Sequence, residues 1–190
     1  MRFRTQAITF KPPSLDEEEL ELKMNTPIYQ TYDEMIIEQG DFKLVVEPGD
    51  FKRGEVIVIL GKNGIGKTTF FKELVQKEKL NISYKPQTIK ATFEGTVEEL
   101  FNGKIGSMYS NELFRTNVIR PLKVHDLLQH DVQSLSGGEL QRVAICLALG
   151  KPADLYLLDE PSAFLDCEQR VITSFVIKKF AIESQRPIMV

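Results

Sequence analysis

The feature that most constrains the fold is a run of branched apolar residues that leads directly into a glycine-rich turn. Residues 56–60 (VIVIL) predict a parallel strand buried on both faces. The next eight residues, 61–68 (GKNGIGKT), match the pattern G-x-x-x-x-G-K-[ST], and a predicted helix follows with Phe71, Leu74 and Val75 on one side. A strand, a glycine turn and a helix in this order predict an α/β fold in which the turn binds phosphate.

Each part of this turn has a role in binding a nucleoside triphosphate. Its glycines let successive backbone N–H groups curve around phosphate oxygens, and the start of the helix adds its positive end. Lys67 is expected to reach the β- and γ-phosphates, and the Thr68 hydroxyl is expected to ligate Mg²⁺. A structural turn is the alternative, but the strand and the helix on its two sides argue against it. The predicted nucleotide-binding residues of the turn are Gly61, Asn63, Gly64, Gly66, Lys67, Thr68 and Thr69.

Two adjacent acids follow a second predicted buried strand, residues 155–158 (LYLL). Because ligands of open α/β sheets bind at the carboxyl ends of the strands, Asp159 and Glu160 are expected near the phosphate-binding turn. Asp159 is a candidate ligand of Mg²⁺, directly or through water, and Glu160 is the candidate that polarises an attacking water. Taken alone, Glu160 would more simply be a surface carboxylate, and the phosphate-binding turn is what favours the catalytic interpretation.

Residues 135–141 (LSGGELQ) predict the beginning of another helix. Ser136 and Glu139 fit a capping box, which on its own explains a well-capped helix and nothing more. Gly137 and Gly138, however, leave the helix entrance without side chains, so its N–H groups and positive dipole end are open to an external anion. This stretch is therefore a candidate second phosphate-binding site.

The other periodic segments complete an alternating pattern of strands and helices. Further strands are predicted at residues 42–46, 81–84 and 187–190, and helices at the spacing of residues 140–147 and over residues 169–182. A capping box at Ser14 predicts a short early helix, and residues 3–10 suggest an opening strand. Residues 93–128 have a mostly helical periodicity, which glycines and Pro121 interrupt.

Charge and composition exclude several classes of protein. The formal net charge is −3, from 24 basic and 27 acidic residues, which excludes a polycation held on nucleic acid or membrane by bulk charge. Cys146 and Cys167 are too few for a disulfide framework or a cysteine-rich metal cluster. No apolar stretch is long enough to span a membrane, and residues 1–10 lack the apolar core of a signal peptide, so we expect a soluble, cytoplasmic chain.

In order along the chain, the turn at 61–68, the glycine pair after Ser136 and the acids at 159–160 resemble the motifs of ATP-binding cassette (ABC) ATPases. The resemblance implies a P-loop α/β fold with a mostly parallel core sheet, an antiparallel β edge and a small helical subdomain. It implies that the signature residues contact the γ-phosphate bound to an opposite nucleotide-binding domain. Those signature residues are Ser136, Gly137, Gly138 and Glu139.

The same resemblance implies three further site residues. Gln87 looks like the glutamine that senses Mg²⁺ and the attacking water, and Asp166 looks like part of the D-loop, which communicates across the domain pair. Tyr32 looks like the aromatic residue that stacks on adenine. Stacking suits an exposed ring, but a lone tyrosine is also a common packing residue.

Several stretches are closer to one family within this class. Residues 81–87, 135–143, 150–154 and 159–170 resemble the second nucleotide-binding domain of the RNase L inhibitor family, the soluble twin-cassette ABC ATPases of ribosome recycling. The interval before the signature has no room for the long coiled coil of chromosome-maintenance and repair relatives. The resemblance implies binding of Mg-ATP, and hydrolysis, once paired with a second cassette, that drives ribosome splitting and translation initiation. The implied partners are a second nucleotide-binding domain, ribosomal subunits and a release factor, with no membrane.

The chain also departs from the family pattern. The family's iron–sulfur domain and first cassette are absent, and the two cysteines match no cluster spacing, so ATP and Mg²⁺ are the expected cofactors and no iron–sulfur cluster is expected. The family's switch histidine is absent too, because His125 and His130 both precede the signature. We therefore expect a truncated piece of the family protein. Residues 1–190 would form a single ABC-type domain that is incomplete at its C-terminus, with residues 88–135 as an inserted helical subdomain.

Two other functions are open from the sequence. The ATPase subunit of a membrane ABC transporter shares every catalytic motif, and a permease partner would distinguish it. A non-catalytic fragment that binds nucleotide or a partner is the second alternative, since an isolated chain has half of each composite site and little expected activity. A thermal shift with Mg-ATP would separate a folded binder from a poorly folded product.

Overall fold

The computed structural model describes residues 26–39, 42–62, 64–77 and 81–190. Its centre is a parallel sheet of four strands in the order β5-β8-β7-β6. The strands are β5 (Val56–Ile57), β6 (Ile82–Lys85), β7 (Leu155–Leu158) and β8 (Ile188–Met189). This arrangement confirms the predicted α/β fold with a parallel core sheet. The strand suggested at 3–10, the helix suggested at Ser14 and the site residue Asn63 lie outside the described residues.

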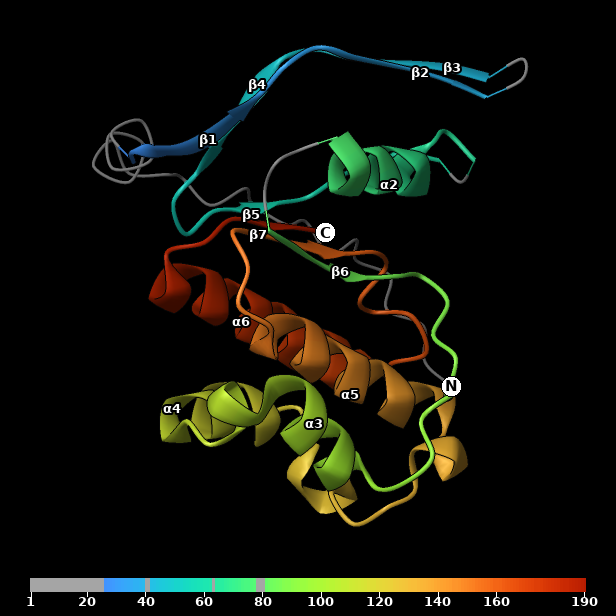
Figure 1. Ribbon diagram of the computed structural model, residues 1–190, viewed down its shortest axis with the longest axis vertical. Coiled ribbons are helices and arrows are strands. Elements are labelled where there is room, and N and C mark those ends of the chain that lie inside the picture. The colour runs from blue at the N-terminus through green and yellow to red at the C-terminus, as the bar shows by residue number, and fades with distance from the viewer. Residues whose placement is uncertain (1–25, 40–41, 63, 78–80) are drawn as a thin grey trace, which may run out of the picture.

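Helices cover both faces of the parallel sheet, and β7 shows why. All of its residues are buried, and successive side chains alternate between the faces. Leu155 and Leu157 share an apolar core with α2, whereas Tyr156 and Leu158 share another with α5 and α6. Figure 1 shows α2 above the sheet and α5 and α6 below it. The bounds of these helices are Lys67–Lys77 for α2, Gly137–Gly150 for α5 and Cys167–Ser184 for α6.

A second, antiparallel layer lies over α2, on the side away from the parallel sheet (Figure 1). In the described part of the chain it consists of two pairs, β1 with β4 and β2 with β3, neither of them hydrogen-bonded to the parallel sheet. Met35 and Phe51 of this layer are buried against the α2 core. The antiparallel strands thus form a layer of their own and not an edge of the core sheet. Their bounds are Ile28–Tyr32 for β1, Met35–Gln39 for β2, Phe42–Val46 for β3 and Gly49–Lys52 for β4.

The strand before the glycine-rich loop is shorter and more exposed than the sequence predicts. β5 ends at Ile57, and the side chains of Val58 and Leu60 are 59% and 84% exposed. Hydrogen bonding continues on one side only, from the Ile59 N–H to the Val190 carbonyl oxygen at 2.7 Å. Val56 packs against the core beside α5 and α6, and Ile57 and Ile59 pack against the core beside α2. The strand therefore has contacts on both faces, but it is only partly buried and not fully buried as predicted, because β5 lies at the edge of the sheet.

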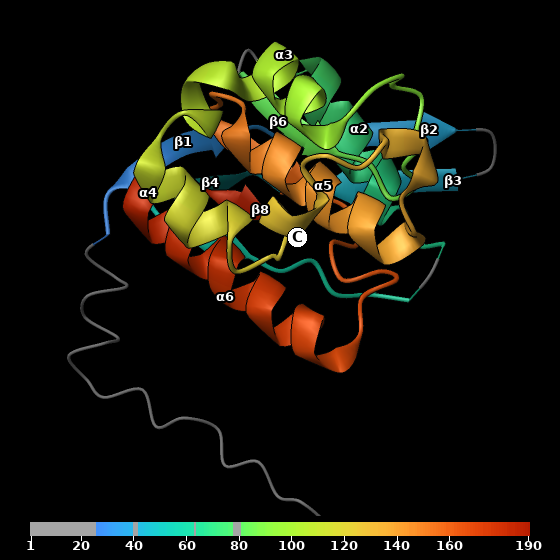
Figure 2. The ribbon, with the colours of Figure 1, turned by 90° about the horizontal axis from the view of Figure 1, so that it is seen from below.

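The segment between β6 and α5 is helical and packs below α5, as Figures 1 and 2 show. Thr96 and Glu99 form a capping box that starts α3. The close approach of α3 and α5 depends on Gly150, where a side chain would meet Ile105. No helix in the described ranges is long and apolar enough to cross a membrane. The helical elements are α3 (Val97–Tyr109), α4 (Glu112–Phe114), a π-helical turn (Arg115–Ile119) and two 3₁₀ turns (His125–Leu127 and Val132–Ser134).

Candidate functional site

The loop between β5 and α2 has the backbone that a phosphate-binding turn requires. Gly64 and Gly66 have φ angles of +84° and +100°, in a region that residues with side chains rarely adopt. α2 begins at Lys67, and its first turn closes with the Phe70 N–H on the Gly66 carbonyl oxygen at 2.8 Å. The N–H groups at the start of α2 and its positive dipole end therefore lie at the loop, where they can bind an anion.

The Lys67 ammonium is held inside this loop by backbone oxygens. It donates to the carbonyl oxygen of Gly61 at 2.5 Å and to that of Lys62 at 3.1 Å. Two other predicted nucleotide-binding residues belong to the same loop and helix: Gly61 is exposed, and Thr69 is half-buried in the first turn of α2. Because both acceptors are neutral carbonyls, phosphate oxygens could replace them as stronger, charged acceptors for the ammonium.

The next residue, Thr68, connects this loop to the acid at the end of β7. Its hydroxyl donates to Asp159 Oδ2 at 2.7 Å, and Asp159 is buried, with only 4% of its surface exposed. The Tyr84 hydroxyl approaches the same oxygen at 3.5 Å. Burial, and then the Asp159 charge, raise the pKa of Tyr84 to about 12, so Tyr84 stays a neutral donor at physiological pH. The structure thus brings together two residues that the sequence proposed as Mg²⁺ ligands.

The two side chains at this point fit Mg²⁺ in their chemistry. A hydroxyl and a carboxylate are oxygen ligands, which Mg²⁺ prefers. The described residues hold no cluster of three or more His, Cys, Asp or Glu side chains that could cage a metal by themselves. A cation held by Thr68 and Asp159 would therefore need phosphate oxygens and water to complete its ligands, as Mg²⁺ sites with nucleotides do.

Lys85 is a buried cation beneath this site that the sequence analysis did not single out. It ends β6, is 2% exposed, and donates to the carbonyl oxygen of Asp159 at 2.8 Å and to that of Pro86 at 3.1 Å. Burial lowers the pKa of Lys85 to about 8, although the charges of Asp159 and Glu160 oppose that change. Lys85 therefore fixes the backbone from which both acids project.

The lowered pKa of Lys85 predicts a pH dependence of stability. The unfolded lysine keeps its proton up to about pH 10.5, whereas the folded one loses it near pH 8, so the free energy of unfolding should rise with pH between these values. Urea denaturation at pH 7.5 and 9.5 should show a rise of about 2 kcal/mol in the wild type relative to Lys85→Met. Tyr84 contributes the opposite sign only above pH 10, as its raised pKa is approached. Equal changes in the two proteins would contradict this prediction.

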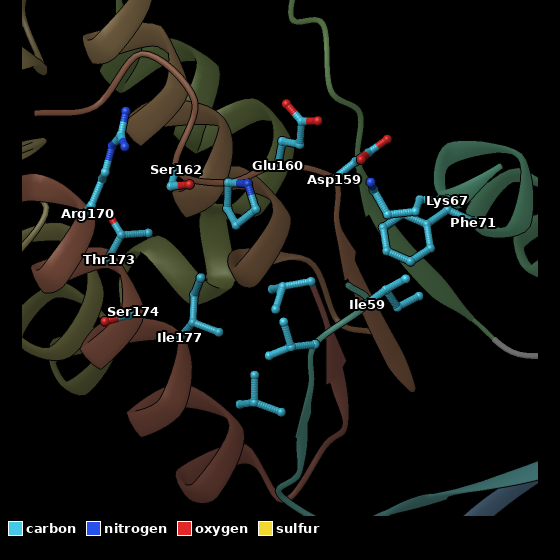
Figure 3. Close-up of a pocket in the computed structure, with 14 residues that line it drawn as sticks. Ile59, Lys67, Phe71, Asp159, Glu160, Ser162, Arg170, Thr173, Ser174 and Ile177 are labelled. Atoms are coloured by element: carbon cyan, nitrogen blue, oxygen red, sulfur yellow. The ribbon is translucent and has the colours of Figure 1, made fainter. Parts of the chain in front are cut away.

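Glu160 lies between two cavities. One, of about 370 Å³, is also lined by Lys67 and Asp159, and Figure 3 shows these three residues at one end of it and α6 residues at the other. The other, of about 440 Å³, is also lined by Gln87 and Phe164. Glu160 is exposed, so its carboxylate is accessible to water from either side.

Gln87 lines the same cavity as Glu160, but among the described residues it is not bonded to Thr68 or Asp159. It is exposed, just after β6, and it makes no hydrogen bond with Thr68 or Asp159 in the described structure. The predicted pairing of Gln87 with Mg²⁺ therefore stays a prediction. Its place on the same cavity as Glu160 is the arrangement that the structure gives.

The signature residues begin α5 as the capping box predicts. The Ser136 hydroxyl and N–H both donate to Glu139 Oε2, at 2.6 and 2.8 Å, and the Glu139 N–H donates to Ser136 Oγ at 3.4 Å. The bonds from the Ser136 hydroxyl, and then from its N–H, lower the pKa of Glu139. Gly137 is exposed and Gly138 half-buried, both against Phe164. Ser136 and Gly137 are exposed, so this end of the helix is open to solvent beside Phe164, where an external anion can approach it.

The last two predicted site residues are Asp166 and Tyr32. Asp166 caps α6, where its Oδ1 accepts from the Gln169 N–H at 2.7 Å. Tyr32 ends β1, and its ring packs on Phe51 with centroids 5.0 Å apart. Tyr32 also lines a cavity of about 470 Å³ together with Gly66 and Lys67 of the loop. Tyr32 therefore packs on Phe51 and also lies beside the loop, so both the packing role and the role in adenine stacking stay open.

Sequence reasoning missed Tyr84, Lys85 and Gln141 as parts of the site. Gln141 is 1% exposed and donates to the Glu160 carbonyl oxygen at 2.9 Å. Lys85 and Gln141 both support the acids through backbone atoms. Polar side chains within otherwise apolar elements were the available signal, since such groups are buried only with partners.

The profile of the ABC transporter family matches residues 48–163. Translation initiation factor rli1 of Schizosaccharomyces pombe is 48% identical over 186 residues, which cover 98% of this chain and 31% of that protein. ABC transporter E family member 3 of Arabidopsis thaliana is 44% identical over 167 residues, covering 80% of this chain and 92% of that protein.

A solved structure adds a match in three dimensions. The crystal structure of archaeal ribosome recycling factor aABCE1, in complex with archaeal ribosomal stalk protein aP1, aligns with a TM-score of 0.84 at 42% identity. The alignment covers 100% of this chain and 38% of that one. The chain thus spans about a third of the length of rli1 and of aABCE1.

Proposed function

Because the chain belongs to the ABC ATPase family, within the RNase L inhibitor group that includes Rli1 and ABCE1, we propose that it binds Mg-ATP at residues 61–69. We propose further that, paired with a second cassette, it hydrolyses ATP to ADP and phosphate. The observation that carries the proposal is the 2.7 Å contact between Thr68 and Asp159. It joins the helix behind the glycine loop to the acid at the carboxyl end of β7, where the ligands of such sheets bind.

The binding step follows from the loop. The N–H groups of residues 64–69 surround the outer phosphates, and Lys67 exchanges its two carbonyl partners for phosphate oxygens. Thr68 and Asp159 are the residues that would hold Mg²⁺, with Gln87 approaching from the neighbouring cavity. Bound Mg²⁺ neutralises charge on the phosphates. Tyr32 would stack on the base, supported by the cavity that it shares with Lys67.

The hydrolytic step is mostly positioning. Glu160 would orient and polarise a water in line with the γ-phosphate, and Gln87, on the same cavity, would help to place that water. Lys85 keeps the backbone of Asp159 fixed during this step. The protein forms no covalent bond with the substrate in this step, so small displacements of Glu160 should lower the hydrolysis rate with little effect on the affinity for Mg-ATP.

The complete site would need two cassettes. We propose that residues 1–190 act as one nucleotide-binding domain with residues 88–135 as a helical subdomain. The signature (Ser136 to Glu139) would bind the γ-phosphate held by the partner cassette, and Asp166 would lie at the pair interface. The exposed start of α5 supports this role, because a helix N-terminus that is open to solvent can bind an external anion.

We propose that the work done by this ATPase is ribosome splitting and translation initiation in the cytoplasm. The names of rli1, a translation initiation factor, and aABCE1, a ribosome recycling factor bound to a ribosomal stalk protein, support this proposal. Ribosomal subunits and a release factor are the proposed partners, and no membrane permease is expected. Cosedimentation with ribosomal subunits tests this, and copurification with a permease in membranes would oppose it.

Binding and hydrolysis are tested separately. Saturating Mg-ATP should raise the melting temperature by about 5–10 °C, since a ligand at 100-fold its Kd stabilises by about 2.7 kcal/mol. EDTA should remove most of that shift. The hydrolysis rate should rise more steeply than linearly with protein concentration, because each composite site needs two chains. Absence of any thermal shift would contradict the proposed function.

Ser136→Arg should block pairing and spare nucleotide binding. The arginine would project from the bare start of α5 into the space of the partner's γ-phosphate. Sedimentation velocity with a non-hydrolysable ATP analogue should show a monomer, while the Kd for Mg-ATP changes less than about twofold. Gln133→Arg, which adds the same side chain at an exposed position just before the signature, is the matched control and should still pair. Loss of nucleotide affinity in monomeric Ser136→Arg would rule out the role in trans.

A further inference from the structure

The first turns of α5 contact the loop of residues 160–164 near its start and near its end. Near the start of the loop, Gln141 Nε2 donates to the Glu160 carbonyl oxygen at 2.9 Å. Near its end, Gly138 lies so close to Phe164 that a Cβ would sit 3.0 Å from the Phe164 carbonyl oxygen. Gln141 is 1% exposed, so its amide is committed to this contact and excluded from water. The helix that starts with the signature is therefore attached directly to the loop of the candidate base.

The backbone at this loop needs such support. Glu160 and Phe164 have φ angles of +47° and +62°, in the left-handed region that is unfavourable for residues other than glycine. Strained backbone persists only where surrounding contacts hold it. The Glu160 carbonyl oxygen accepts two bonds, from Gln141 and from the Ala163 N–H at 3.1 Å. No hydrogen bond in the described structure holds the Glu160 carboxylate itself, so its direction depends on this backbone.

We propose that Gln141 is a positioning residue for the Glu160 carboxylate. Its amide fixes the left-handed backbone of Glu160, and it sits one helical turn after Gly138. The inference rests on the proposed function, because it assigns Gln141 a role in presenting the base of that reaction.

The test separates positioning from packing. Gln141→Met keeps the length and volume of the side chain and removes the donor. Gln169→Met is the matched control, because Gln169 is also a buried glutamine, 7% exposed, and its side-chain oxygen has no hydrogen-bond partner in the described residues. Wild type and both variants are compared by deuterium exchange of residues 160–165, by the Kd for Mg-ATP, and by single-turnover hydrolysis at high protein concentration.

Gln141→Met should raise exchange in residues 160–165 about tenfold and lower the hydrolysis rate about tenfold, with Kd unchanged. Gln169→Met should leave all three at wild-type values. Unchanged exchange and rate in Gln141→Met, or an equal loss in Gln169→Met, would overturn the proposal. If the wild type binds Mg-ATP but never hydrolyses it, the proposed hydrolysis fails, and exchange at 160–165 still decides whether Gln141 holds the loop.

Discussion

Replacement of Lys67 by alanine is expected to weaken Mg-ATP binding by roughly 100-fold, since each charge-assisted hydrogen bond contributes about 1.5–3 kcal/mol. The ammonium already lies within the loop, 2.5 Å from the Gly61 carbonyl oxygen, so it needs only to exchange acceptors to meet the phosphates. Isothermal titration of the isolated chain measures this effect. The fold should survive, because Lys67 is only half-buried and its present contacts are within the loop.

Lys72→Ala is the matched control for this prediction. Lys72 is an exposed lysine on the same helix, α2, and its loss removes the same charge from the same region. If general electrostatic attraction carried binding, both variants would lose affinity to a similar degree, by the modest amount expected for screened surface charge. An unchanged Kd in Lys67→Ala would remove the basis for assigning a nucleotide to this loop.

The parts of the site that sequence predicted best are those in which local chemistry fixes local structure. Positive φ at Gly64 and Gly66 is a direct consequence of the loop's curvature, and the capping box at Ser136 and Glu139 forms as its residue types indicate. The bounds of β7 agree because a four-residue apolar run between Asp154 and Asp159 can end nowhere else. Such features need no knowledge of distant contacts.

The parts that sequence missed depend on contacts between distant segments. β1, β2 and β4 have short, mixed patterns, and residues 48–50 (PGD) are typical of a turn, yet Gly49 pairs with Tyr32 in the β1–β4 ribbon. Lys85 can be buried because its ammonium donates hydrogen bonds to the carbonyl oxygens of Asp159 and Pro86. Only the parallel pairing of β6 with β7 brings Asp159 there.

The same distinction explains Asp166. Its residue type and position before an amphipathic stretch are typical of an N-cap, and the structure shows that cap on α6. The role in communication between cassettes came from family resemblance and stays a prediction. A cap and an interface role are compatible, because Asp166 is exposed and only one of its carboxylate oxygens accepts the Gln169 N–H.

Glu160→Gln should reduce hydrolysis by at least roughly 100-fold while leaving the affinity for Mg-ATP within about twofold. The amide matches the carboxylate in size but cannot polarise water as an anion does. The backbone that positions residue 160 is unaffected, because Gln141 bonds to its carbonyl oxygen and not to its side chain. Single-turnover hydrolysis and titration of the same preparation measure the two quantities. The variant should also accumulate the ATP-bound pair, since cassettes that cannot hydrolyse ATP have no product state in which to separate.

Glu168→Gln provides the control for loss of an acid near this site. Glu168 is an exposed carboxylate in the first turn of α6, where its ion pair with Lys123 at 3.5 Å contributes little. It should hydrolyse ATP at the wild-type rate. If Glu160→Gln hydrolysed as fast as Glu168→Gln, Glu160 could not be the group that polarises the water, and Gln87 would then be the next residue to replace, because it lines the same cavity. If Glu160→Gln instead lost affinity for Mg-ATP, the acid would act in binding, and the division of work between Asp159 and Glu160 would be wrong.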